Sequence, residues 1–162
     1  MKAVLLDTGV LLRERHVGDI HHQTVVGAIE KLVGTGWSIY TAPQCLQEYW
    51  AVATRPPEAR GGLGLSVERA AEDIEQIISA HDVLVETAEL FQVWRRIVTD
   101  YRVLGRQVWD ARIAAIMQLH GIKHLLTFNT QDFVRFDFIR AWSPEDVDGL
   151  LQYANMNRGG DA

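Results

Sequence analysis

Four acidic residues stand where short apolar runs end or where helices are expected to begin. They are Asp7 in AVLLDTGVLL, Glu48 in TAPQCLQEYW, Asp110 in VWDARIAAIM and Asp132 in LLTFNTQDF. Carboxylates gathered at one edge of a parallel sheet repel one another, and a hard divalent cation such as Mg²⁺ or Mn²⁺ is the commonest way to hold that charge. Because a metal held by carboxylates suits phosphate chemistry, the four residues together predict a metal site for such chemistry.

Short apolar runs alternate with segments of helical spacing along most of the chain. The run AVLL at 3–6 is typical of a buried central strand. Further strands are expected at 38–42, 83–86, 124–128 and 138–142. Helices are expected at 24–36, 43–55, 66–81, 87–103 and 110–121, with a short helical turn after residue 10 and a last short helix from 144. This order predicts an α/β domain with a mostly parallel central sheet of four to five strands and helices on both faces.

Individual residues refine these limits. Pro43 falls in the first turn of its helix, where proline is tolerated, and PPEARGGLGLS at 56–66 is expected to be a loop. In the helix at 24–36, which Gly36 can close, one face is expected to carry four apolar side chains: Val25, Ile29, Leu32 and Val33.

The composition fits one domain without a membrane anchor. The 162 residues are 48% hydrophobic, and the net charge of −5 argues against a broad, nonspecific nucleic-acid-binding surface. The single cysteine, Cys45, cannot form an internal disulfide and is expected to be a small buried hydrophobe in a reducing, cytoplasmic protein. No signal peptide is recognisable, and no apolar stretch approaches the roughly 20 residues of a membrane span. We expect the functional domain at 1–146, followed by a helix end and polar tail at 147–162.

Each acidic residue also has an ordinary local explanation. Asp7 could cap the next helical turn. The Asp-Thr-Gly triplet of aspartic proteases belongs to β-rich proteins, and a phosphatase of the haloacid dehalogenase type would need an aspartate where Gly9 stands. Asp110 could cap the helix after it, a role compatible with binding a metal. Glu48 could be a solvated surface group, but its largely apolar neighbours predict a face sheltered from open water.

The segment LLTFNTQDF supplies several oxygen donors after the fourth expected strand. Thr127, Asn129 and Asp132 lie within six residues. They could contribute ligands to a metal or hydrogen bonds to its ligands. They could equally be ordinary turn residues, for which asparagine and aspartate are common choices.

Five stretches together give the chain a resemblance to one family. LLDTGVLL, PQCLQEYWAVATRP, GLGLS, GRQVWDARIAA and LLTFNTQDFVRF occur in the family's order and cover most of residues 3–142. The chain resembles PIN-domain ribonucleases, and specifically the VapC-type toxins of bacterial type II toxin–antitoxin pairs. The resemblance implies a three-layer PIN-like domain that is a metal-dependent endoribonuclease, which cleaves RNA phosphodiester bonds with a metal-activated water. It also implies an RNA substrate, a homodimer and an antitoxin that blocks the acidic groove.

The same resemblance assigns roles to particular residues. Asp7, Glu48 and Asp110 match the core acids and would hold one or two Mg²⁺ or Mn²⁺ ions. Where the family often has a fourth acid, this sequence has Asn129, so that either Asp132 or a water takes the place of that acid. Asp132 therefore joins the three core acids as a candidate catalytic residue. Residues expected to support the ligands are Thr8, Thr127 and Asn129.

Two other functions stay open at this point. A non-catalytic PIN-like module could bind RNA or protein, since the fourth acidic position is altered. A phosphohydrolase could act on small phosphomonoesters through Asp7, with a covalent aspartyl-phosphate as intermediate. Metal-dependent cleavage of RNA by the purified protein would separate the nuclease from the binding module.

Other polar and aromatic residues carry weaker expectations. The indole of Trp109 is expected to pack in the core, and its alternative role is to stack a base beside Asp110. His21 and His22 are expected to lie where a loop meets a helix rather than to bind a metal, since adjacent residues do not face the same way on a helix. Candidate contacts to phosphate are Arg13, Arg15, Arg55, Arg60 and Arg106.

Overall fold

A five-stranded parallel sheet forms the centre of the molecule in the computed structural model, which describes residues 1–157. The strands are β1 (Ala3–Leu6), β2 (Ser38–Thr41), β3 (Asp82–Val83), β4 (His124–Leu126) and β5 (Arg140–Trp142). They lie in the order β3-β2-β1-β4-β5, and every neighbouring pair is parallel. The sheet predicted from the alternation of apolar runs and helical segments is therefore confirmed.

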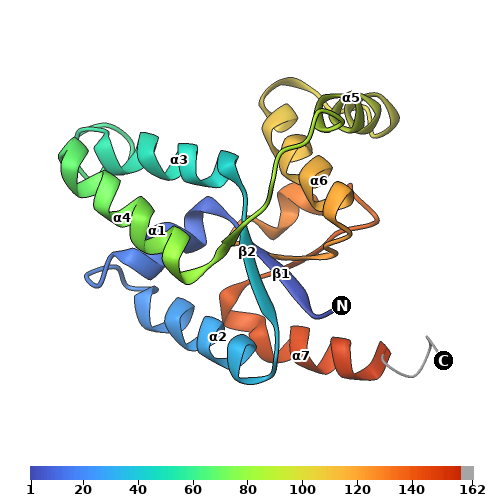
Figure 1. The fold of residues 1–162 in the computed structure, drawn as a ribbon, viewed down its shortest axis with the longest axis horizontal. Coiled ribbons are helices and arrows are strands. Elements are labelled where there is room, and N and C mark those ends of the chain that lie inside the picture. The colour runs from blue at the N-terminus through green and yellow to red at the C-terminus, as the bar shows by residue number, and fades with distance from the viewer. Residues whose placement is uncertain (158–162) are drawn as a thin grey trace.

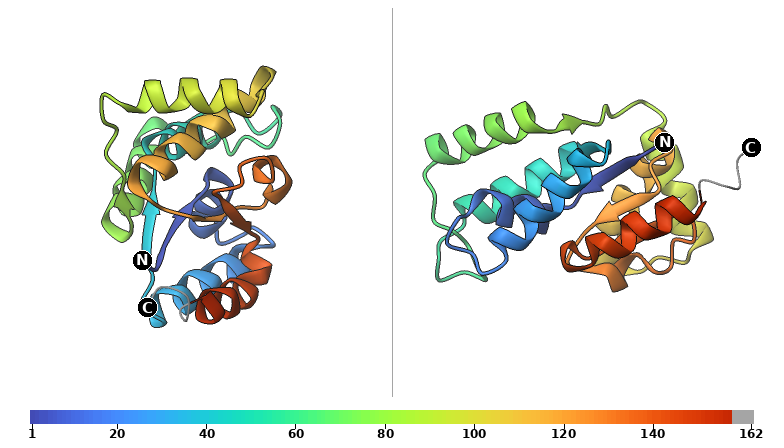
Figure 2. Two further views of the ribbon diagram at one scale, coloured as in Figure 1. Left: turned by 90° about the vertical axis from the view of Figure 1, so that its right-hand side faces the viewer. Right: turned by 90° about the horizontal axis from the view of Figure 1, so that it is seen from below.

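Helices cover both faces of this sheet. They are α1 (Thr8–Arg15), α2 (His22–Gly34), α3 (Pro43–Thr54), α4 (Val67–Ala80), α5 (Leu90–Asp100), α6 (Val108–His120) and α7 (Val147–Met156). Short 3₁₀ turns occur at η1 (Gly105–Gln107), η2 (Thr130–Phe133) and η3 (Pro144–Asp146). Figures 1 and 2 both show α2 and α7 on one side of the strands and α5 and α6 on the other, which confirms the expected three layers.

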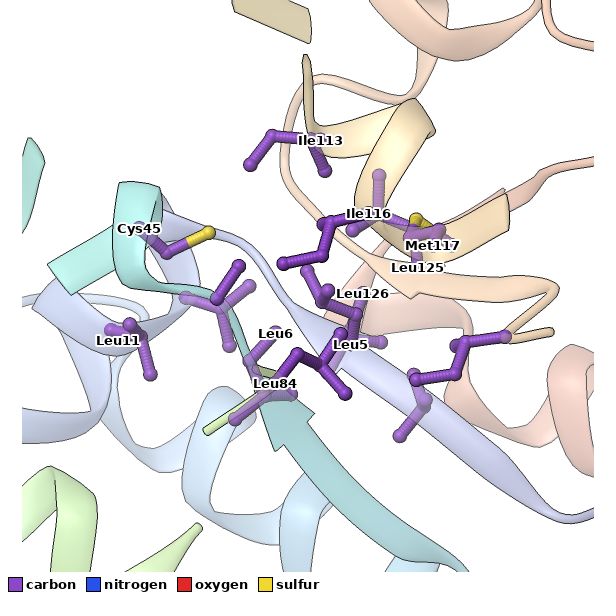
Figure 3. Close-up of a cluster of buried hydrophobic side chains, with 14 of the residues drawn as sticks. Leu5, Leu6, Leu11, Cys45, Leu84, Ile113, Ile116, Met117, Leu125 and Leu126 are labelled. Carbon is purple, nitrogen blue, oxygen red and sulfur yellow. The ribbon is translucent and has the colours of Figure 1, made fainter. Parts of the chain in front are cut away.

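The core is built from the central strands and the apolar helix α6. Leu5 and Leu6 of β1 are fully buried, because a central strand of a covered sheet has no solvent face. Ile116 and Met117 of α6 pack in the same cluster, and Figure 3 shows these side chains converging on the strands. Cys45 is also fully buried there, and burial raises the pKa of its thiol well above the usual range. The expectation that Cys45 is a small buried hydrophobe is confirmed.

Several limits differ from those expected from the sequence. The strand expected at 83–86 is the two-residue edge strand β3, after which the Leu84 amide still donates to the Thr41 carbonyl at 2.9 Å while Val85 is exposed. The fourth strand ends at Leu126 rather than at 128, and the helix expected at 87–103 covers only Leu90–Asp100. An edge strand has one neighbour and one wet side, so apolar residues such as Val85 do not by themselves extend it.

The buried face of helix α2 differs from the predicted one at Val33. Its buried residues are Val25, Ala28, Ile29 and Leu32. At 100° per residue these four form a continuous stripe, and Val33 falls beyond its edge, where the side chain is 57% exposed. The expectation that Val33 shares the core face is therefore wrong.

The last helix packs against α2 near the end of the described region. Val147 and Leu150 of α7 are buried, and α7 contacts α2. Asn155 and Met156 of the expected polar tail belong to this helix, whereas 158–162 lie outside the described residues. The division into 1–146 and 147–162 stays a prediction. No helix within 1–157 is long and apolar enough to cross a membrane.

Candidate functional site

Asp7 and Thr127 are brought together by the register of the two central strands. Leu6 pairs with Leu126, so that the next residue of each strand lies at the carboxyl edge of the sheet. The Asp7 amide donates to the Leu126 carbonyl at 3.1 Å, and the Thr127 hydroxyl donates to Asp7 Oδ2 at 2.7 Å. Thr127 therefore donates to the Asp7 carboxylate, and its role in supporting a metal ligand stays a prediction.

The other oxygen of Asp7 caps helix α1. Asp7 Oδ1 accepts from the Thr8 amide at 2.8 Å, so the local explanation as a helix cap is confirmed and coexists with a place in the site. Burial raises the pKa of Asp7, against the lowering effect of the hydrogen bonds from Thr127 and Thr8. The negative charges of Glu48 and Asp132 raise this pKa further, so these carboxylates lie close enough to repel.

Glu48 reaches the same place from helix α3. Its Oε2 accepts from the Thr8 hydroxyl at 3.1 Å, and its Oε1 accepts from Gln44 Nε2 at 2.8 Å. Glu48 lies beyond the first turn of α3 and is exposed, so the expectation of a face sheltered from water is wrong. The reason is tertiary, since the face of α3 that carries Glu48 lines an open pocket.

Gln44 is a residue of the site that the sequence reasoning missed. Its side chain is only 5% exposed, and Gln44 Nε2 also donates to the Trp109 carbonyl at 3.1 Å. It thereby ties α3, which carries Glu48, to the first turn of α6. The available signal was a glutamine four residues before an acid on one helix, a spacing that places two side chains on one face.

Asp110 lies inside the first turn of α6 rather than ahead of it, since Gln107 occupies the cap position. A carboxylate in the first turn is still stabilised by the helix dipole. Burial, together with repulsion from Asp132, Asp7 and Glu48, raises the pKa of Asp110 to about 6. These electrostatic couplings place all four predicted acids in one neighbourhood.

A pocket of about 750 Å³ opens over these acids. Its lining includes Thr8, Glu48, Asp110 and Asp132, with Asp7 directly behind Thr8. Asn129 is not part of this lining, and its backbone N–H donates to the Thr127 hydroxyl at 3.0 Å. The structure therefore brings Asp132 to the pocket and leaves Asn129 to order the loop behind it.

The carboxylate oxygens of these acids are the ligand type that a hard divalent ion prefers, although the side chains are not arranged around a common point. Within residues 1–157, no three Asp, Glu, His or Cys side chains are grouped closely enough to hold a metal ion. Asp7 and Glu48 instead point their oxygens at Thr8, Thr127 and Gln44. The pKa of Asp7 and that of Asp110 are raised mainly by burial and further by the negative charges of the neighbouring acids.

The arginines expected near the site divide into two groups. Arg55 and Arg106 line the pocket. Arg13 stacks on the Phe128 ring, 4.4 Å from its centroid, and Arg15 lies 3.8 Å from the buried carboxylate of Asp73. Arg60 is exposed in the loop after α3 and does not line the pocket.

Trp109 and the paired histidines also have clear positions. The Trp109 side chain is 59% exposed at the pocket wall, so the expectation that it packs in the core is wrong. Its neighbours Val108 and Asp110 are half-buried, and the first turn of α6 projects beyond the core. His21 and His22 lie at the start of α2, where the His21 amide donates to Asp19 at 2.8 Å, as expected.

Comparison with known proteins decides the family. The family model described as the PIN domain matches residues 4–139. The chain belongs to the PIN domain family. This confirms the resemblance carried by the five stretches from LLDTGVLL to LLTFNTQDFVRF.

Relatives of this PIN domain include named ribonucleases and toxins. Ribonuclease VapC48 of Mycobacterium tuberculosis is 29% identical over 140 residues, which cover 85% of this chain and 94% of that protein. The crystal structure of VapBC2 from Rickettsia felis, bound to a DNA fragment from their promoter, matches with a TM-score of 0.64 and 14% identity, covering 87% of this chain and 98% of that chain. VapC20 of Mycobacterium tuberculosis, a sarcin-ricin loop cleaving toxin, matches with a TM-score of 0.50 and 24% identity, covering 75% and 86% of the two chains. The two structures share the fold of this PIN domain.

The raised pKa of Asp110 predicts how the stability of the metal-free PIN domain depends on pH. A carboxyl whose pKa rises from 3.8 unfolded to about 6 folded adds stability below 3.8, and this contribution is lost as the pH rises through 6. Asp110→Asn removes the charge, and we expect it to raise the melting temperature near pH 7.5 by about 2–4 °C, or about 1 kcal/mol after allowance for solvent screening.

Thermal unfolding followed by circular dichroism in the presence of a chelator measures this effect. The gain of Asp110→Asn over wild type should shrink towards zero near pH 4, where the folded wild-type protein carries Asp110 protonated. A variant less stable than wild type near pH 7.5 would show that the Asp110 charge is not under repulsion.

Proposed function

We propose that this PIN domain is a metal-dependent endoribonuclease and the toxin of a toxin–antitoxin pair. The observation that carries the proposal is one pocket lined by Glu48, Asp110 and Asp132 with Asp7 behind it, in a chain whose PIN match spans residues 4–139. The relative VapC48, matched over 85% of this chain, is a ribonuclease by name. A phosphohydrolase of the haloacid dehalogenase type would need a second aspartate where Gly9 stands, and a purely binding module would not need four acids kept in mutual repulsion.

The proposed metal ligands are Asp7, Glu48 and Asp110, with Asp132 on the pocket rim in place of the fourth acid. Mg²⁺ or Mn²⁺ suits this set because hard cations prefer carboxylate oxygens. When bound, such an ion activates water as a nucleophile and offsets the charge that develops on the phosphoryl oxygens.

The protein's own part is to hold these carboxylates and the substrate in place. Thr127 and Thr8 fix the Asp7 carboxylate through its two oxygens, at 2.7 and 2.8 Å. Gln44, one helical turn before Glu48 on α3, donates to the Glu48 carboxylate at 2.8 Å and holds it in place. Fixed donors and acceptors cost no reorganisation during the reaction, which is why such positioning accelerates it.

The RNA is expected to enter over the open face of the pocket. Arg55 and Arg106 line that face and offer guanidinium groups to flanking phosphates, for which the planar fork is well suited. Asn129 orders the loop that carries Asp132 through its bond to Thr127. We assign it a supporting role.

The same acidity accounts for the proposed partners. An open nuclease site would harm its own cell, so an inhibitor is expected, and a basic side chain fits a pocket lined by acids. Arginine pairs bidentately with carboxylates and could quench the repulsion among them. We therefore propose an antitoxin that inserts a basic side chain into this pocket. The resemblance to VapC-type toxins further supports a homodimeric toxin, and the single free cysteine supports a cytoplasmic location.

Expression of the chain in a bacterial host tests the toxin assignment. Wild-type protein made alone should arrest growth, and Asp7→Asn made at the same level should be tolerated. Co-expression with the small protein encoded beside it should restore growth. A wild-type chain that is harmless without any partner would overturn the toxin assignment while leaving a housekeeping nuclease open.

A further inference from the structure

A second cavity, of about 550 Å³, adjoins the acidic pocket. We call it the aromatic cavity. Its walls come from helices α5 and α6, which lie side by side (Figure 1), and include Phe91, Trp94, Val108 and Trp109. Trp109 lines both this cavity and the pocket over the acids, so the two pockets adjoin at this residue. Whatever occupies the aromatic cavity therefore lies next to the four acids.

The aromatic rings at this cavity are exposed yet held in place. Phe91 is 60% exposed and stacks on Trp94, with ring centroids 5.6 Å apart and an interplanar angle of 28°. Trp94 is fixed in turn, because its Nε1 donates to the Val108 carbonyl at 2.9 Å. The backbone of Trp109 is anchored from the other side by Gln44. Large exposed rings on rigid supports form a surface suited to stacking a planar ligand.

The aromatic cavity has a polar end as well as apolar walls. Arg112 Nη2 donates to Glu86 Oε1 at 2.7 Å, and the two side chains are 29% and 32% exposed. Both residues line the cavity, so a ligand there meets an acceptor and a donor beside the rings. Apolar walls with a few convergent polar groups are typical of small-molecule ligand sites.

The polar end of the aromatic cavity is also connected to the acidic pocket. Arg112 Nη1 lies 3.4 Å from Gln44 Oε1, and Gln44 Nε2 donates to Glu48 at 2.8 Å. Arg112 is thus linked to the proposed metal ligand Glu48 through Gln44, and Glu86 is linked to it through Arg112 and Gln44. A ligand that spans both pockets would connect to Glu48 through this chain of side chains.

We infer that the aromatic cavity is a subsite for one unpaired RNA base next to the scissile phosphate, stacked on Trp109 and Phe91. This inference rests on the proposed function. A nucleobase fits because its faces are aromatic, its edge carries donors and acceptors for Glu86 and Arg112, and its backbone leads directly into the acidic pocket. A paired base cannot enter, so the subsite restricts cleavage to single-stranded or looped RNA.

The test uses an RNA that the wild-type protein cleaves and protein carrying Asp7→Asn, so that the RNA stays intact. Fluorescence anisotropy measures the affinity for the labelled RNA and for copies with an abasic nucleotide on either side of the cleaved bond. Trp109→Ala is compared with Trp109→Phe, which keeps a ring, and with Val67→Ala, which removes an equally exposed side chain from α4.

We expect Trp109→Ala to weaken binding by about 5- to 150-fold, the range for loss of one stacked base. One abasic copy should bind the parent protein more weakly by a similar factor and should add no further loss in Trp109→Ala. Trp109→Phe should keep most of the affinity, and Val67→Ala should bind as the parent does.

The outcomes separate the two proposals. Equal binding by Trp109→Ala and its parent, or an abasic penalty that is the same in both, would overturn the base subsite while leaving the nuclease intact. Unchanged RNA binding with lost association between protein chains would identify the cavity as a protein contact and would also overturn the inference. If the wild-type protein cleaves no RNA, it is the proposed function that fails.

Discussion

Purified Asp7→Asn protein is expected to lose RNA cleavage by about 100- to 1,000-fold or more, the loss typical of removing one group that stabilises a transition state. Glu48→Gln and Asp110→Asn should behave alike. Each substitution keeps the shape of the side chain and removes one negative charge from a cluster that burial and repulsion already disfavour. The variants should therefore fold, and initial rates on a labelled single-stranded RNA give the measurement.

Two further variants sharpen this comparison. Asp132→Asn should lower the cleavage rate by about 10–100-fold, the usual range for a residue that assists the metal ligands without binding the ion itself. We expect this smaller effect because Asp132 lies exposed on η2, at the rim of the pocket. Glu75→Gln, which removes an exposed acid from α4, should leave the rate unchanged. Near-normal cleavage by two of the variants at Asp7, Glu48 and Asp110 would show that the acids do not form the active site.

Divalent metal is expected to raise the melting temperature of the wild-type protein. An ion that binds only the folded state stabilises it by about 2.7 kcal/mol at a concentration 100 times its dissociation constant. For a domain of this size that corresponds to about 5–11 °C. The gain should shrink markedly in Asp7→Asn, which lacks one proposed ligand, and differential scanning fluorimetry with Mn²⁺ or Mg²⁺ measures it without reference to activity.

Screening of repulsion by salt is the competing explanation for such a gain. Sodium chloride at equal ionic strength should raise the melting temperature much less than the divalent ion does, because screening acts weakly on partly buried charges. A gain that is the same in wild type, in Asp7→Asn and with sodium chloride would mean that the cation acts on the general surface rather than at these carboxylates.

The central sheet and the position of Asp7 at its edge follow from local sequence features. AVLL is continuously apolar because β1 is covered on both faces, and the acid after it must then lie at the sheet edge. The parallel pairing of β1 with β4 places Thr127 beside that acid, as its position after a strand suggested. The strands depend on a burial pattern that the sequence records, whereas the pairing of β1 with β4 is seen only in the folded sheet.

The features that sequence reasoning missed depend on contacts between distant helices. Gln44 joins the site because α3 packs near the start of α6. The residue spacing within either helix does not reveal this contact between them. The same packing leaves Glu48 and Trp109 exposed at a pocket, although both have apolar neighbours in the sequence. Exposure of a side chain on an amphipathic helix is decided by which partner covers it, and that partner lies outside the local segment.

Cleavage of single-stranded RNA by metal-stripped protein, with and without added Mn²⁺ or Mg²⁺, is the most direct test of the central claim. Internal cleavage should appear only when the ion is present, disappear on chelation and be absent in Asp7→Asn. The same fragments from chelated wild-type protein, or from Asp7→Asn with the ion present, would contradict it.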